Sequence, residues 1–119
     1  MPMDFAETDD FTGEFKRLRK KYKTLDEDLG ILKSIIRCYP NGNNSRHWNI
    51  LTEDGDCVIL KMRMMCRSLR GASLRIVYLY DEQKRYVQFI EIYYKGDKGR
   101  EDEGLYRLML VEYLNNRNK

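Results

Sequence analysis

Residues 57–66 read CVILKMRMMC, and the alternation within this stretch decides how the chain folds. Its even-numbered positions are all apolar, whereas its odd-numbered positions include Lys61 and Arg63. Successive side chains of a β-strand point to opposite faces of a sheet, so a period of two predicts a strand. One face of this strand is then core and the other is cationic. The apolar positions are Val58, Leu60, Met62, Met64 and Cys66.

Two more strand-like stretches follow, SLRIVYLY at residues 73–80 and RYVQFIEIYY at residues 85–94. The four residues between them, DEQK, suit the turn of an antiparallel hairpin. Arg75 stands between two apolar residues, which places it on the cationic face as well. Three cations on one sheet face repel one another unless an anion arrives from outside. The alternative is that they are ordinary solvated side chains on an exposed face.

Helical periodicity precedes the strands. Residues 10–23 predict an amphipathic helix, because Phe11, Phe15, Leu18 and Tyr22 recur on one face. The tetrapeptide TLDE at residues 24–27 has the spacing of a capping box, in which the first and last residues satisfy each other's backbone donors. We expect a second helix from this point that ends near Cys38, since PNGNNS follows as turn chemistry. That helix buries Leu29, Leu32, Ile35 and Ile36.

The remaining segments complete an α+β domain. Residues 3–8 predict a short strand and residues 102–115 a final helix, while His47 and Trp48 are expected in a loop. The whole chain then forms one domain with an antiparallel sheet of mostly three to four strands. The helices pack on one face of this sheet, two from the N-terminal part and one at the C-terminus.

Length and composition limit the class of protein. A chain of 119 residues with 42% hydrophobic content supports one core. It has no apolar run of the ~20 residues that span a bilayer, and its acidic start is unlike a signal peptide, so we expect a soluble, cytoplasmic protein without a membrane partner. No zinc-site spacing occurs, and we expect neither a metal nor a cofactor. The three cysteines are interpreted as reduced core thiols: Cys38, Cys57 and Cys66.

Charge is unevenly distributed along the chain. All 22 lysine and arginine residues lie beyond residue 14, whereas five of the 19 acidic residues lie within residues 1–14. The body of the chain is therefore basic enough to bind a polyanion, although many basic domains bind no nucleic acid. Candidate contacts to RNA phosphates occur on the first helix and after the first long strand; the alternative is a solvated surface. They are Lys16, Arg17, Lys20, Lys23, Arg67 and Arg70.

Several stretches taken together resemble the RelE-type toxins of bacterial toxin–antitoxin systems. They are FTGEFKRLRKKY, LKMRM, SLRIVYLYD, FIEIYYK and REDEGLY, in this order and over nearly the whole chain. The resemblance implies a small α+β fold and a cognate antitoxin that binds the toxin in a hetero-oligomer. It also implies a ribosome-dependent endoribonuclease that cuts mRNA in the ribosomal A site. Neighbouring branches of the family instead poison DNA gyrase.

The resemblance assigns roles to five residues. Lys61 and Arg63 match two basic residues that contact and activate the scissile phosphodiester, with Arg63 where a lysine is usual. Arg75 matches an arginine that stabilises the transition state, and Arg100 and Tyr106 match a closing pair six residues apart. The sequence departs from the family pattern in two places. The loop CRSLRGAS at residues 66–73 is longer than is usual in the family, and Arg100 has acidic neighbours.

The chemistry of RNA cleavage by its own 2′-OH fits these residue types. It needs a base, cations for the developing phosphoryl charge and an acid for the leaving oxygen, and none of these has to be a metal ion. The base here would be Lys61 or Tyr106. By periodicity alone, Tyr106 is as well explained as a packing residue, because it aligns with Leu110, Tyr113 and Leu114. Two other functions stay open: a toxin of the same fold with a target such as gyrase, and a non-catalytic module that binds RNA or an acidic protein.

Overall fold

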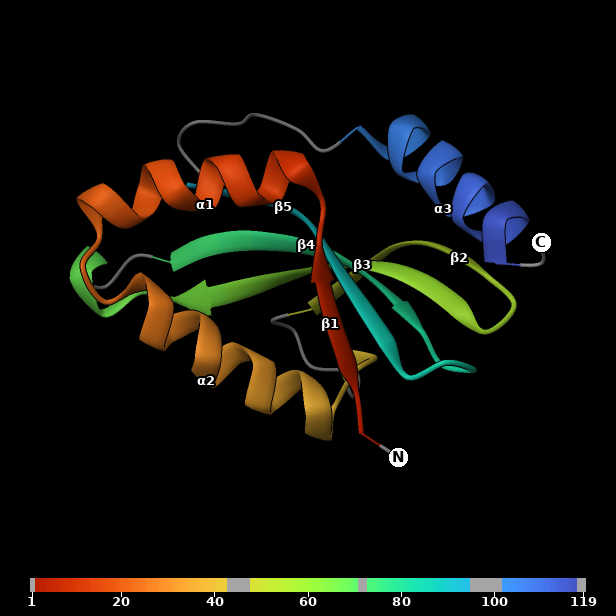
Figure 1. Cartoon of the computed structure of the whole chain (residues 1–119), viewed down its shortest axis with the longest axis horizontal. Coiled ribbons are helices and arrows are strands. Elements are labelled where there is room, and N and C mark those ends of the chain that lie inside the picture. The colour runs from red at the N-terminus through yellow and green to blue at the C-terminus, as the bar shows by residue number, and fades with distance from the viewer. Residues whose placement is uncertain (1, 43–47, 71–72, 95–101, 118–119) are drawn as a thin grey trace.

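The computed structural model describes residues 2–42, 48–70, 73–94 and 102–117, which form the predicted α+β fold (Figure 1). A five-stranded sheet has the strand order β1-β5-β4-β3-β2. The elements, in chain order, are β1 (Asp4–Glu7), α1 (Asp9–Lys21), α2 (Leu25–Cys38), β2 (Trp48–Asp54), β3 (Cys57–Met65), a 3-10 turn at Arg67–Leu69, β4 (Ser73–Asp81), β5 (Tyr86–Tyr94) and α3 (Glu103–Arg117).

The three strands expected from alternation are confirmed as the centre of the sheet. β3 pairs antiparallel with β4 along its whole length, from Cys57 opposite Asp81 to Met65 opposite Ser73. β4 pairs antiparallel with β5, as the hairpin turn predicted. The short N-terminal strand is also confirmed, and it adds to the far edge of β5 in parallel.

The sheet is larger than the sequence indicated. Trp48 does not lie in a loop; it begins β2, an edge strand that pairs antiparallel with β3. The register between β2 and β3 shifts between Ile50 and Thr52, so no simple alternation marks this strand. His47 lies outside the described residues.

The first face of the sheet carries the main core. α1 and α2 pack there through the apolar positions that periodicity identified, including Phe11, Phe15, Leu29 and Leu32. Phe11 stacks against Phe89 of β5, with 5.2 Å between ring centroids. Ile35, also expected to be buried, is 37% exposed.

The capping box at the start of α2 is not formed. The Thr24 hydroxyl donates to Asp28 Oδ2 at 2.8 Å, and it makes no capping bond to the backbone of the helix. The Thr24 amide instead donates to the Ser68 hydroxyl at 3.2 Å, and the Glu27 carboxylate forms an ion pair with Arg67. Both partners come from the 3-10 turn after β3, so tertiary contacts replace the local cap.

α3 packs on the opposite face of the sheet from α1 and α2, rather than beside them (Figure 1). Its buried Tyr106 and Leu110 cover one end of that face. The sheet residues beneath them are Cys57, Ile59, Val77, Leu79 and Ile90. The other end, where β3 finishes and β4 begins, carries the predicted cations. No helix within the described ranges is long and apolar enough to cross a membrane.

Candidate functional site

The cationic face is built by the registers of three neighbouring strands. Arg63 of β3 lies directly opposite Arg75 of β4, and Arg75 lies directly opposite Tyr93 of β5. Side chains at directly opposed positions share a face and are about 5 Å apart at Cβ. A row of two arginines and a tyrosine therefore crosses the sheet.

A second row lies two residues further along the strands. Lys61 of β3 is opposite Val77 of β4, which is opposite Glu91 of β5. Neighbouring strands are about 4.8 Å apart, so the Cα atoms of Lys61 and Glu91 are separated by about 10 Å. This row places a carboxylate on the same face as the cations.

Sequence reasoning missed both Glu91 and Tyr93, because β5 contains a bulge. The register shifts between Val77 and Tyr78, so that one extra residue of β5 is left between Phe89 and Glu91. The signal in the sequence is Phe89 followed at once by buried Ile90 and then, after Glu91, by buried Ile92, a pattern that breaks strict alternation.

The three cations differ in their surroundings. Arg75 is only 9% exposed, and its Nη1 donates to the Ser73 hydroxyl at 2.6 Å. Arg63 is exposed and Lys61 is half-buried. Within the part of the chain that the structure describes, neither Arg63 nor Arg75 forms an ion pair with a carboxylate. A half-buried surface with two closely spaced guanidinium groups is suited to hold an anion.

The C-terminal pair assigned by the resemblance is only partly described. Arg100 lies outside the described residues. Tyr106 is fully buried at the start of α3, in agreement with its packing periodicity, and its hydroxyl donates to Glu91 Oε1. The tyrosine thus reaches the cationic face through the carboxylate.

The candidate RNA contacts fall into different environments. Lys16, Arg17 and Lys20 on α1 are exposed, and so is Lys23 in the turn after this helix. Arg17 lines a groove of about 350 Å³ together with Glu91 and Tyr93. Arg17 also pairs with Glu14. Arg70 is exposed after the 3-10 turn.

Arg67 is held within the protein. Its Nε donates to buried Asp28 Oδ1 at 3.1 Å, and its Nη2 pairs with Glu27. Burial alone would raise the pKa of Asp28, but hydrogen bonds from Thr24 and Arg67 outweigh it and lower the pKa below its usual value. This arginine therefore fastens the 3-10 turn to α2.

Comparison with known proteins rests on structure. No family model matches the chain, and no curated protein matches it in sequence. Among solved structures, a chain of the archaeal RelE–RelB complex from Pyrococcus horikoshii OT3 superposes with a TM-score of 0.58. The match covers 82% of this chain and 100% of that one, at 14% sequence identity. The fold is that of the RelE-type toxins. At this identity the likeness establishes the fold alone.

On this RelE-like fold, an apolar groove of about 460 Å³ runs between α2 and β3. Ile31 of α2 and Met65 of β3 line it and are 55% and 68% exposed. Trp48 and Ile35 line it as well. Arg63 belongs to both the groove and the cationic face. The groove therefore leads directly to the candidate site.

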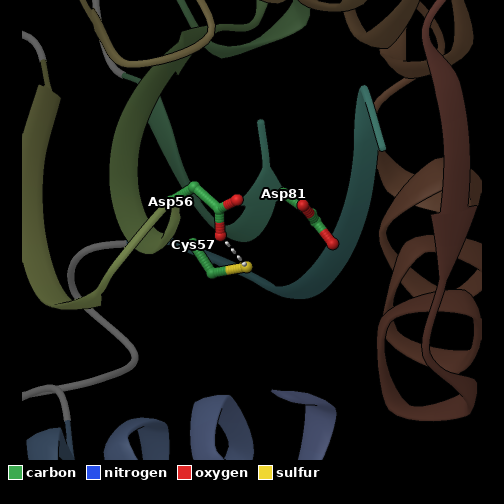
Figure 2. A group of neighbouring side chains, drawn as sticks. All are labelled: Asp56, Cys57 and Asp81. Atoms are coloured by element: carbon green, nitrogen blue, oxygen red, sulfur yellow. Dashed lines mark hydrogen bonds between the residues drawn. The ribbon is translucent and has the colours of Figure 1, made fainter. Parts of the chain in front are cut away.

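A separate cluster closes the far end of the RelE-like sheet. Asp56, Cys57 and Asp81 bring three potential metal-ligand atoms within 4.8 Å of one another, and Figure 2 shows the Cys57 thiol donating to Asp56. Arg117 of α3 fills this cluster, with its Nη1 at 3.1 Å from Asp56 Oδ1 and 3.2 Å from Asp81 Oδ1. Tyr113 also donates to Asp81, at 2.6 Å. A guanidinium thus supplies the positive charge, and the cluster fixes the last turn of α3.

The cysteines only partly match their prediction. Cys57 and Cys66 are buried free thiols, whereas Cys38, at the end of α2, is exposed rather than in the core. Burial and the nearby Asp81 charge raise the pKa of Cys57 to about 12, and burial also raises the pKa of Cys66. The two buried thiols are accordingly protonated at neutral pH.

Proposed function

We propose that this chain is the toxin of a toxin–antitoxin pair, and that it is a metal-independent endoribonuclease acting on mRNA bound to the ribosome. The observation that carries the proposal is the direct cross-strand pairing of Arg63 with Arg75 on a RelE-like sheet. Directly opposed like charges are destabilising, so a fold that retains them has a use for an anion at that place. Guanidinium groups bind phosphate oxygens through short, charge-assisted hydrogen bonds, so a phosphodiester suits this position.

The proposed reaction is attack of the RNA 2′-OH on the adjacent phosphorus. Charge develops on the non-bridging phosphoryl oxygens, and preorganised cations there stabilise the transition state. Arg63 and Arg75 take this role, and Lys61 joins them as a cation next to the reacting atoms. Arg100 and Tyr106, assigned by the resemblance, complete the proposed set.

The ribosome has two parts in this proposal. It presents the message in the geometry that in-line attack requires, which removes the entropic cost of ordering a flexible strand. Its RNA also offers phosphates to Lys16, Arg17 and Lys20 on α1, to Lys23 just after this helix, and to Arg70. Arg67 contributes less, because it is already held by Asp28 and Glu27.

The proposed protein partner is a cognate antitoxin, bound in the groove between α2 and β3. The related archaeal toxin fold was solved in a RelE–RelB complex. Here the exposed apolar side chains of Ile31, Ile35 and Met65 give a partner surface to bury, at about 25 cal/mol per Å². Because Arg63 lines the same groove, a segment seated there with an acidic side chain would cover the site and block it.

The experiment is induction of the chain in a bacterial host, followed by mapping of message ends and by a DNA supercoiling assay on purified gyrase. We expect growth arrest, new 5′ ends within translated messages and normal supercoiling. Growth arrest with uncut messages and with inhibited supercoiling would instead indicate that the toxin acts on DNA gyrase. Normal growth would contradict a toxin of either kind.

A further inference from the structure

The bulge in β5 places a carboxylate where the proposed reaction needs a base. We propose that Glu91 is a catalytic residue, the general base that takes the proton from the RNA 2′-OH, and that Tyr106 is the residue that positions it. This inference rests on the proposed ribonuclease function and deepens it, since the cationic residues alone provide no good base at neutral pH.

Three observations carry the assignment of Glu91. It shares a face with the cations, as the end of the row Lys61, Val77, Glu91. It is half-buried and lines the groove beside Tyr93, so its carboxylate is reachable from solvent. Its Oε1 accepts a hydrogen bond from the buried Tyr106 hydroxyl, which restricts the orientation of the carboxylate.

The spacing of the rows matches an in-line displacement. Glu91 and Lys61 lie on either side of β4, with about 10 Å between their Cα atoms. Val77 between them is fully buried, so a phosphodiester has to bind beside it, over Arg75 and Tyr93 of the neighbouring row. Arg75 lies two residues from Val77 along β4, about 7 Å away, where its guanidinium can contact the non-bridging oxygens. The proposed base Glu91, the phosphate-binding Arg75 and the proton donor Lys61 therefore surround the position proposed for the phosphodiester.

Glu91 accepts the 2′-OH proton as the 2′-oxygen forms its bond to phosphorus, and the bond from phosphorus to the 5′-oxygen breaks. The Lys61 ammonium gives a proton to the departing 5′-oxygen. The products are a 2′,3′-cyclic phosphate and a 5′-hydroxyl, and proton exchange with water returns both side chains to their starting states. A carboxylate has about four lone-pair sites, so a bond from Tyr106 does not exhaust its capacity to accept.

Tyr106 acts through Glu91 in this account. Its ring is buried against the sheet with Leu110 and Val77, which fixes the hydroxyl, and the hydroxyl fixes the carboxylate. The sequence motif that ends in Tyr106 thereby gains a function without exposing the side chain.

The test is single-turnover cleavage of mRNA on programmed ribosomes by the full chain and its variants. Glu91→Gln keeps the shape of the side chain and an acceptor for Tyr106, but removes the base. We expect cleavage to slow by about 100-fold or more, while binding to the ribosome stays the same or tightens because a negative charge near the phosphate is lost. Glu82→Gln, an exposed carboxylate in the β4–β5 turn, is the matched control and should cut at the wild-type rate.

A double-mutant cycle tests the positioning role. Tyr106→Phe should slow cleavage by about 10-fold in the wild-type background and cause no further loss in Glu91→Gln, because the hydroxyl has nothing left to position. A purely structural tyrosine would give equal losses in both backgrounds, which would overturn this part of the proposal. If Glu91→Gln fails to fold, Glu91→Asp, which withdraws the carboxylate by one methylene, should show a slower rate with intact binding.

The outcomes separate the two proposals. Wild-type cleavage together with undiminished cleavage by Glu91→Gln would overturn the role of Glu91 and leave the ribonuclease function standing. No cleavage by the wild-type chain would overturn both.

Discussion

Arg63 and Arg75 lie directly opposite each other across β3 and β4, and both point to the sheet face that α3 leaves partly uncovered. Directly opposed like charges cost a sheet about 0.2–1 kcal/mol compared with neutral pairs. The pair is thus a local cost to stability at the place where the proposed substrate binds. Proteins commonly carry such costs at functional sites.

The arginine pair predicts that removing one of its charges makes the fold more stable and weakens anion binding. Arg63→Gln should raise the free energy of unfolding by about 0.2–1 kcal/mol in urea titrations, because it removes the repulsion. Sulfate should stabilise the wild-type chain, by about 1.4 kcal/mol at ten times its dissociation constant, and should stabilise this variant less. Lys84→Gln, in the exposed turn after β4, serves as the control and should keep the full response to sulfate. Equal responses of all three proteins would argue against an anion site.

Alternation in β3 was enough to predict half of the candidate site. The period of two in CVILKMRMMC placed Lys61 and Arg63 on one face, and the same rule added Arg75 from the next strand. From Lys61 to Met65, buried positions of β3 alternate with exposed or half-buried ones, which is the case in which sequence parity is most reliable.

The rest of the site depends on irregularities that parity does not reveal. The bulge beside Ile90 turns Glu91 onto the cationic face, and a second register shift hides β2 from any search for alternation. The capping box failed for a related reason, since Glu27 is drawn to Arg67 by a contact 40 residues away in sequence. Tertiary contacts decided each of these points.

The cluster that holds the end of α3 predicts sensitivity to acid. Burial alone would raise the pKa of Asp81, but hydrogen bonds from Tyr113, the Lys84 amide and Arg117 outweigh it and lower the pKa below 3.8. A lowered carboxyl pKa in the folded state stabilises the protein above about pH 3.8, and this stabilisation is lost as pH falls through the folded value.

Asp81→Asn should therefore destabilise the chain at pH 7, by about 1.5–3 kcal/mol in urea unfolding, because the charged hydrogen bonds of Asp81 to Arg117 and Tyr113 are lost while Asp56 still pairs with Arg117. The difference from wild type should shrink as the pH is lowered below 3.8. Asp26→Asn removes an exposed partner of Arg19 and should cost less than about 0.5 kcal/mol at any pH. A loss for Asp81→Asn that did not change with pH would contradict the ionic account.

The groove between α2 and β3 predicts variants that keep toxicity but escape neutralisation. Ile31→Glu places a charge among apolar lining residues that a partner would bury, while Ile31 is far enough exposed for the fold to tolerate it. In a host that co-expresses the proposed cognate antitoxin, wild-type toxicity should be suppressed and that of Ile31→Glu should persist. Lys84→Glu, in the exposed turn after β4, should stay toxic and be neutralised like the wild type. Equal neutralisation of all three would place the partner elsewhere.

The thiols should differ in reactivity. Cys38 is exposed, whereas Cys57 and Cys66 are buried and have raised pKa values. Native protein treated with iodoacetamide at pH 8 should be labelled at Cys38 first, with the other two labelled only after denaturation, as read by peptide mass spectrometry. Rapid labelling of Cys57 in the native state would mean that α3 leaves the sheet readily.

The most direct test of the central claim compares the wild-type chain with Arg75→Ala in a reconstituted translation system, with primer extension to map cuts in the message. If Arg75 stabilises the transition state of RNA cleavage, the wild type should produce new 5′ ends at ribosome-bound codons. Arg75→Ala, with its fold verified by circular dichroism, should then cut at least ~100-fold more slowly. A message left intact by stoichiometric wild-type protein, or cut equally fast by the folded Arg75→Ala variant, would contradict the account.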